Sequence, residues 1–322
     1  MTVIILWIFI FIVGYLTIYF SADIFLDNLK ELCIIYGISP FIIGMLIIGI
    51  DPEESIASIV AAINDLSYIA VGNVIGNSII ALTISFAIPA YFYQIHIKSI
   101  HQFYFSLLYI SLILILIGTL INFGLFVVGI MVIILYFIYT FRNIKLIAKD
   151  NIVENAPMGE LVISDNEKTA LAKESRLRIL FYVLLSFFFI LLGGELLIYS
   201  TRQIIIATNI PETFFGLVII AFVTNVEEIT LVFKSIKKKS VEIGLGGMIG
   251  KVIWNLTLTF GISAIIIMNF NSLWIIFWNW LILLTIIIYF NLISKKKGMN
   301  RKDGILLTVI LTAFLILNFF YI

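Results

Sequence analysis

Two short acidic segments lie inside long apolar stretches of this chain, where charged side chains are rare. Their oxygen-bearing residues are Asp51, Glu53 and Glu54 in the first segment and Thr224, Asn225, Glu227 and Glu228 in the second. An ionised carboxylate costs roughly 2.5–3.5 kcal/mol at the centre of a lipid bilayer, so such groups persist where they face water, a counter-charge or an ion. Because hard cations such as Na⁺ and Ca²⁺ prefer oxygen ligands, the segments predict a cation site. The alternative is that the acids only pair with buried donors and fix the fold.

Helix geometry predicts different roles for the two members of each acidic pair. Pro52 lacks a backbone donor and clashes with the preceding turn, so we expect a break or kink there that frees carbonyl groups beside the carboxylates. Adjacent residues on a helix point about 100° apart, so only one member of each pair can face a site squarely. We expect Glu54 and Glu228 to face the ion, and Glu53 and Glu227 to line an access path or to pair elsewhere.

Two other apolar stretches contribute amide side chains and one lysine. Asn77 and Asn255 can each offer a neutral oxygen to a cation or hydrogen-bond between helices, and both roles stay open. Lys251 lies ten residues after Val241, inside an apolar stretch. We hypothesise that its ammonium pairs with Glu54 or Glu228 and stands in for one bound monovalent cation. The alternative is that the side chain extends along its apolar stem to the cytoplasmic interface.

The composition requires a lipid environment for these residues. The chain has 322 residues, of which 62% are hydrophobic and 12% charged, whereas soluble domains have about 25% charged residues. A formal charge of +1 with basic residues in short connections argues against nucleic-acid binding. One cysteine excludes a disulfide framework and a Cys-based zinc site. We see no nucleophile–base pair, so we expect a membrane protein that is not an enzyme, with the lipid bilayer and inorganic cations as its partners.

Apolar stretches long enough to cross a membrane recur along the whole chain. A spanning helix needs about 20 apolar residues. The sequence therefore predicts an all-α polytopic protein with ten transmembrane helices, at residues 2–26, 39–64, 67–92, 103–121, 124–147, 176–200, 211–234, 241–268, 272–294 and 303–321.

Basic residues predict the orientation of these spans. Eighteen of the 20 Lys and Arg residues fall in odd-numbered connections, and Arg202 alone falls in an even-numbered one. Because Lys and Arg concentrate in cytoplasmic loops, both termini should face outside. We therefore expect a multi-pass protein of the plasma membrane. Heavy Ile and Lys usage with few Pro suggests a prokaryotic source.

The longest polar stretch divides the chain into two halves. Residues 148–175 should form a cytoplasmic linker between a first five-helix repeat, 1–147, and a second, 176–322. Because five is odd, the halves enter the membrane in opposite orientations, as in inverted-repeat transporters. Residues 72–77 parallel 250–255, and residues 40–54 parallel 211–228 with a two-residue gap, which supports an internal repeat.

At these residues the sequence resembles the calcium/cation antiporter superfamily of sodium/calcium exchanger-like membrane proteins. Residues 216–228 follow the spacing of the family's second-half signature, and residues 72–77 follow its first-half third-helix signature. The resemblance implies ten helices in two inverted halves, and it places Thr224 and Glu228 on ion-binding positions. It also implies secondary antiport of a cation such as Ca²⁺ against Na⁺ or H⁺. The first and sixth helices would slide past a core of the second, third, seventh and eighth, with transported cations as the only expected ligands and no cofactor.

The chain departs from the family pattern at several of these positions. Residues 49–54 lack the family's Gly-Thr-Ser, Asn77 and Asn255 replace small hydroxyl residues, and Lys251 and Trp254 replace Asn and Gly. The remaining acids, Asp51, Glu53 and Glu227, could supply the missing charge. Two alternatives therefore stay open, a non-transporting relative with a decayed ion site and a sodium-coupled symporter of another solute.

Overall fold

The computed structural model describes residues 2–35, 51–97, 100–121, 124–150, 176–225, 229, 232–233, 236, 241–267 and 274–320. Within these ranges nearly every residue is helical. The elements are α1 (Thr2–Ile35), α3 (Pro52–Ile63), α4 (Ser67–Phe92), β1 (Ile95–His96), α5 (Gln102–Leu120), α6 (Leu125–Asp150), α8 (Arg176–Thr208), α9 (Glu212–Phe214), η2 (Phe215–Ile220), α10 (Ala221–Thr224), α12 (Val241–Trp254), η3 (Asn255–Thr259), α13 (Phe260–Ile266), α14 (Trp274–Lys296), β2 (Gly298–Met299) and α15 (Arg301–Phe320).

This architecture confirms the predicted helical membrane protein. Among the described residues, eight helices are long and apolar enough to cross a membrane, and two shorter apolar helices cover residues 54–63 and 212–224. A helical segment lies within each of the ten predicted ranges. The number of membrane spans and their arrangement as an inverted repeat stay predictions. One small departure from an all-α fold is the antiparallel pair β1–β2, in which Ile95 lies opposite Met299.

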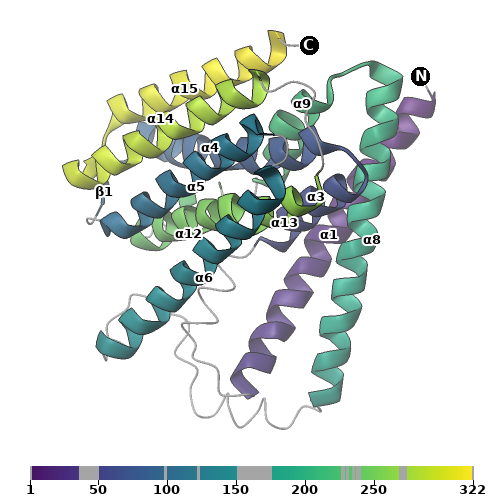
Figure 1. Ribbon diagram of the computed structural model, residues 1–322, viewed down its shortest axis with the longest axis horizontal. Coiled ribbons are helices and arrows are strands. Elements are labelled where there is room, and N and C mark those ends of the chain that lie inside the picture. The colour runs from purple at the N-terminus through teal and green to yellow at the C-terminus, as the bar shows by residue number, and fades with distance from the viewer. Residues whose placement is uncertain are drawn as a thin grey trace.

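Helices α1 and α8 form a long pair at one side of the molecule (Figure 1). The pair is close because glycines meet at its crossing. A Cβ atom on Gly14 would lie 2.7 Å from the backbone nitrogen of Leu197 and 3.0 Å from the carbonyl oxygen of Gly193. The two backbones therefore touch, and we expect the pair to move as one unit. It meets the other helices mainly where α8 packs on α3.

Helix α4 runs through the interior of the remaining helices. Its spanning stretch is 94% buried, against 17–44% for the corresponding stretches of α1, α5, α6, α8, α14 and α15. It packs on α3, η2, α14 and α15. Asn73 and Asn77 thus lie in the centre of the protein, where a polar side chain needs a hydrogen-bond partner.

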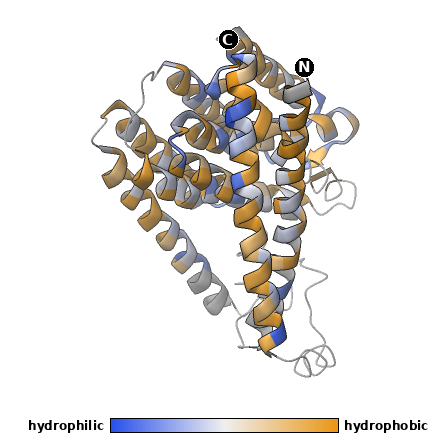
Figure 2. Ribbon diagram, turned by 90° about the vertical axis from the view of Figure 1, so that its right-hand side faces the viewer, coloured by the Kyte–Doolittle hydropathy of each residue, from blue (hydrophilic) through white to orange (hydrophobic). Residues whose placement is uncertain are grey.

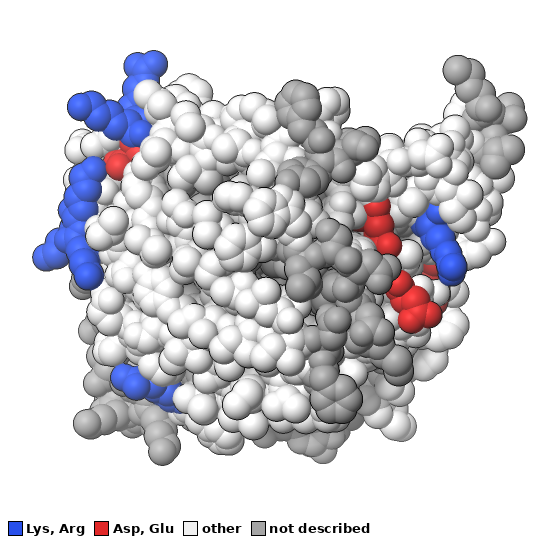
Figure 3. Space-filling view, turned by 45° about the horizontal axis from the view of Figure 1, so that its top comes forward, with Lys and Arg blue, Asp and Glu red and all other residues white. Residues whose placement is uncertain are grey.

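The outer helices expose apolar side chains over a wide surface. Phe9 on α1, Phe141 on α6, Phe181 on α8 and Phe319 on α15 are each more than half exposed. Figure 2 shows α1 and α8 side by side and mostly hydrophobic along their lengths. Figure 3 shows charged side chains toward the left and right of one face, and the described residues between them form a broad uncharged surface. Large exposed apolar surface of this kind marks contact with lipid, as a multi-pass membrane protein requires.

A carboxylate of the second half caps the central helix of the first half. Oε1 of Glu212 accepts hydrogen bonds from the backbone N–H groups of Tyr68, at 2.8 Å, and Ile69, at 3.3 Å. Negative charge is stabilising at a helix N-terminus. We expect Glu212→Gln to lower the free energy of unfolding by about 1 kcal/mol, measured by thermal unfolding in detergent. An unchanged melting temperature would show that the charge contributes nothing there.

Candidate functional site

Lys251 joins two carboxylates in the protein interior. Its Nζ lies 2.8 Å from Oδ2 of Asp51 and 2.7 Å from Oε1 of Glu54. The side chain of Lys251 is only 3% exposed and that of Glu54 only 1%. The alternative in which Lys251 reaches the cytoplasmic interface is therefore wrong, because its ammonium is buried. Pairing with Glu54, one of the two expected partners, is present, and Asp51 is an additional partner.

The start of α3 explains why both carboxylates reach one ammonium. Asp51 is the N-cap of α3 in an extended conformation, and Pro52 occupies the first turn, where a missing N–H is tolerated. Oδ1 of Asp51 accepts a hydrogen bond from the backbone N–H of Glu54 at 3.4 Å. The helix thus begins at the proline, where the sequence predicts a break, and its first turn holds Asp51 and Glu54 together.

Amide groups from two other helices bind the carboxylate of Glu54. Asn77 on α4 donates through Nδ2 to Oε1 of Glu54, and Asn255 in η3 donates through Nδ2 to Oε2 at 2.9 Å. The same Nδ2 of Asn255 lies 3.2 Å from Oδ1 of Asn77, and Nδ2 of Asn77 lies 3.0 Å from Oγ1 of Thr224. Residues from α3, α4, α10 and η3 therefore meet in one buried network.

Three buried amide oxygens border this network without a hydrogen-bond partner among the described residues. They belong to Asn73, Asn225 and Asn255. Nδ2 of Asn225 donates to the backbone oxygens of Ala221, at 2.7 Å, and Asn77, at 3.3 Å, which ties Asn225 to the network. A buried polar atom without a partner is rare and needs an explanation. Neutral oxygens are also ligands that a hard cation accepts.

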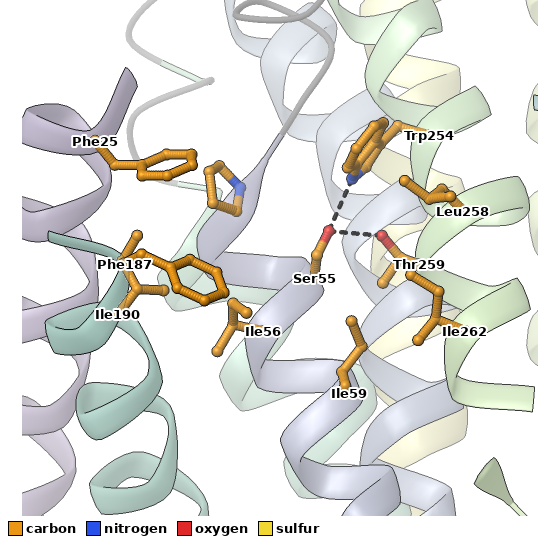
Figure 4. Close-up of a pocket in the computed structure, with 11 residues that line it drawn as sticks. Phe25, Ser55, Ile56, Ile59, Phe187, Ile190, Trp254, Leu258, Thr259 and Ile262 are labelled. Atoms are coloured by element: carbon orange, nitrogen blue, oxygen red, sulfur yellow. Dashed lines mark hydrogen bonds between the residues drawn. The ribbon is translucent and has the colours of Figure 1, made fainter. Parts of the chain in front are cut away.

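A tryptophan and two hydroxyl residues lie beside the carboxylate and were not among the predicted site residues. Nε1 of Trp254 donates to Oγ of Ser55 at 2.7 Å, and Oγ of Ser55 lies 2.7 Å from Oγ1 of Thr259 (Figure 4). Trp254 also packs edge-on against Tyr136. The sequence did contain a signal for these residues, because Ser55 directly follows Glu54 and Trp254 directly precedes Asn255, and both neighbours were predicted site residues. Only the fold shows that the two segments touch.

Ser55, Trp254 and Thr259 form one wall of a cavity of about 170 Å³. It lies among α1, α8, α3 and the η3 region, and residues of each line it (Figure 4). Its lining is mostly apolar: Phe25, Pro52, Ser55, Ile56, Ile59, Phe187, Ile190, Trp254, Leu258, Thr259 and Ile262. The cavity therefore adjoins the carboxylate site through Ser55 and reaches the α1–α8 pair through its two phenylalanines.

Asn255 opens a π-helical segment that interrupts the eighth predicted span. The segment η3 runs from Asn255 to Thr259 between α12 and α13, whereas α4, its counterpart in the predicted repeat, has no such segment. Single π-turns inside α-helices occur frequently at functional sites. A second π segment, η2, precedes Thr224 in the seventh predicted span. The two halves therefore differ in local backbone geometry where they meet the site.

The structure gathers most of the residues that the sequence singles out. Those brought together are Asp51, Glu54, Asn77, Thr224, Asn225, Lys251 and Asn255. Glu227, Glu228 and the side chain of Glu53 lie outside the described residues.

Comparisons with known proteins show the family of the chain and its fold. The model of the family described as "Sodium/calcium exchanger protein" matches residues 6–145 and 178–320. The inner membrane protein YrbG of Escherichia coli (strain K12) is 24% identical over 275 residues, covering 79% of this chain and 78% of YrbG.

Solved structures of the sodium-calcium exchanger NCX_Mj share the fold. One, soaked with 2.5 mM Na⁺ and 10 mM Sr²⁺, has a TM-score of 0.56 at 19% identity and covers 96% of this chain and 98% of that one. Another, soaked with 2.5 mM Na⁺ and 1 mM Sr²⁺, has a TM-score of 0.57 at 18% identity, with coverage of 96% and 97%. The family model matches most of the chain, and the chain therefore belongs to the sodium/calcium exchanger family.

Proposed function

We propose that this protein is a secondary active antiporter that exchanges a cation such as Ca²⁺ for Na⁺ or H⁺ at the buried site around Glu54. One observation carries the proposal. The carboxylate of Glu54 is almost fully buried and is contacted by amides from both halves of the chain, Asn77 and Asn255. A buried ionisable group inside a membrane protein is by default part of an ion or proton pathway.

The proposed mechanism is alternating access, with α1 and α8 as the moving element. The core would consist of α3, α4, α10 and α12, and Glu54 and Glu228 would bind the transported cation. The close glycine contact between α1 and α8 supports their movement as a unit. The apolar cavity between that pair and α3 supports it as well, because sliding needs a surface with few hydrogen bonds to break.

We also propose the ten-helix topology, with repeats 1–147 and 176–322, a cytoplasmic linker 148–175 and both termini outside. The family match in two segments, 6–145 and 178–320, supports this division. The strands β1 and β2 belong to the third and ninth connections, both assigned to the cytoplasm. Their pairing supports the assignment of both connections to one side of the membrane, because it places them at the same end of the molecule.

Radiolabelled Ca²⁺ uptake into proteoliposomes tests the proposed exchange. The vesicle interior would be loaded with Na⁺ in one arm and acidified in the other. Vesicles without an ion gradient are the control. We expect gradient-dependent uptake that Glu228→Gln abolishes, because the spacing of residues 216–228 places Glu228 where the resemblance implies an ion ligand. Absence of uptake under both gradients, with folded protein in the vesicles, would contradict calcium antiport, as would uptake by the variant at the parental rate.

One observation favours a second candidate, a relative that no longer transports. The ammonium of Lys251 already neutralises charge at Asp51 and Glu54, which a transported cation would otherwise do. On this alternative the site is a structural ion pair. Flux decides between the two candidates, because a structural site gives none under any cation gradient.

A further inference from the structure

We propose that Lys251 is a cation built into the core of the carrier, so that each transport cycle needs one monovalent cation fewer than the carboxylates alone would require. The inference rests on the proposed antiport function and deepens it. It makes Lys251 a residue that determines the stoichiometry of exchange.

The ammonium lies where a bound cation would lie. Nζ of Lys251 is within 2.8 Å of one oxygen from each of two carboxylates, Asp51 and Glu54. These oxygens belong to the first turn of a helix that begins inside the protein, at Pro52. A cation at the same point would use the same two oxygens, so the ammonium and that cation exclude one another.

The formal charges of Asp51, Glu54 and Lys251 predict what happens when the lysine is removed. Among the described residues, Asp51 and Glu54 together carry two formal negative charges, and Lys251 reduces their sum to one. Removing one partner of a buried ion pair leaves an uncompensated charge, which is strongly unfavourable in the protein interior. Without the lysine, and at a pH where both carboxylates are ionised, the cluster should therefore recruit one Na⁺ ion from solution.

The position of Lys251 keeps this charge with the core. The residue lies in α12, which packs mainly on α4, α5 and η3. Its partners Asp51 and Glu54 lie at the start of α3, and Glu54 is also held by Asn77 on α4 and Asn255 in η3. Because the proposed moving pair is α1 and α8, the ammonium should remain at its carboxylates in both facing states. It would therefore count as a fixed charge throughout the cycle.

Equilibrium binding of ²²Na⁺ to purified protein in detergent tests the proposal without requiring transport. The measurement is the number of Na⁺ ions bound per chain at saturation, at a pH where carboxylates are ionised. We expect Lys251→Gln to bind one more Na⁺ than the parent. The double variant Asp51→Asn/Lys251→Gln should return to the parental number, because only one carboxylate of the cluster remains.

A matched control uses a lysine ion pair in another part of the protein. Nζ of Lys296 lies 3.3 Å from Oδ2 of Asp303, and the side chain of Lys296 is 57% exposed. Lys296→Gln makes the same chemical change away from the site, so the number of bound Na⁺ ions should not change. An equal increase in this control would show that the extra Na⁺ reflects net charge alone.

Folding provides a second measurement. The melting temperature of Lys251→Gln should rise with NaCl more steeply than that of the parent, with choline chloride maintaining ionic strength, because an ion that binds only the folded state stabilises it. Failure of Lys251→Gln to fold at high NaCl, while Asp51→Asn/Lys251→Gln folds, would overturn the proposal. The reason is that, under the proposal, bound Na⁺ replaces the positive charge lost in Lys251→Gln.

The two proposals fail in different ways. Absence of exchange by the parent protein overturns the antiport function, whatever the Na⁺ count. An unchanged Na⁺ count in folded Lys251→Gln overturns the role of Lys251, even if the parent exchanges cations. If both proposals are correct, the exchange rate of Lys251→Gln should depend on Na⁺ concentration with a Hill coefficient up to one higher than that of the parent.

Discussion

Glu54→Gln should lower the rate of cation exchange by at least about 30-fold, because removing one partner of a buried charge pair weakens binding by about 2–5 kcal/mol and each 1.4 kcal/mol is a factor of ten. The substitution preserves the shape of the side chain but removes its charge. It leaves the ammonium of Lys251 with Asp51 as its remaining carboxylate partner among the described residues. A neutral amide also cannot replace a carboxylate as a charged ligand for a transported cation.

The measurement is initial uptake into proteoliposomes at equal amounts of folded, inserted protein. Glu212→Gln is the matched control, because it makes the same change at a carboxylate whose hydrogen bonds cap α4 near Tyr68 rather than contact Asn77. We expect that control to retain the parental exchange rate per folded molecule. Parental exchange by Glu54→Gln would rule out the carboxylate as part of the transport site.

Gly76→Ala should destabilise the protein by about 3 kcal/mol, at the upper end of the usual cost of overpacking. A Cβ atom on Gly76 would overlap the carbonyl oxygen of Leu217 and lie 2.8 Å from its Cα atom. Because these are backbone atoms of η2, no side-chain rotation relieves the clash, and α4 must move away from η2. Asn77, the next residue, would then lose its 3.0 Å contact with Thr224. Thermal unfolding and exchange should both show the loss.

Gly246→Ala is the control for this substitution. A Cβ atom on Gly246 would have no described atom within 4 Å, and the residue is exposed on α12. Alanine favours helix over glycine by up to about 1 kcal/mol, so this variant should be as stable as the parent or slightly more stable. Equal stability of Gly76→Ala and Gly246→Ala would show that α4 and η2 can separate at little cost.

The sequence by itself determined the environment of the chain and the places of its helices. Hydropathy and proline chemistry are local properties, so apolar stretches predicted the helices and Pro52 predicted the point where α3 begins. The cost of a carboxylate in an apolar stretch identified Glu54 as a candidate for the site, and the 100° rotation per residue favoured it over Glu53. These inferences needed no knowledge of which helices touch.

The tertiary structure alone decided which groups meet. The partners of Glu54 lie far along the chain, at Lys251 and Asn255, and no local pattern distinguishes them from other polar residues in apolar helices. The second role of Asp51, as N-cap and as partner of the same lysine, likewise depended on the fold, which brings Lys251 of α12 to the start of α3. A π segment begins at Asn255, whereas α4 is α-helical throughout, so the predicted repeat does not give the local backbone geometry at Asn255. Contacts between distant segments depend on helix crossing and register, which the whole packed molecule sets.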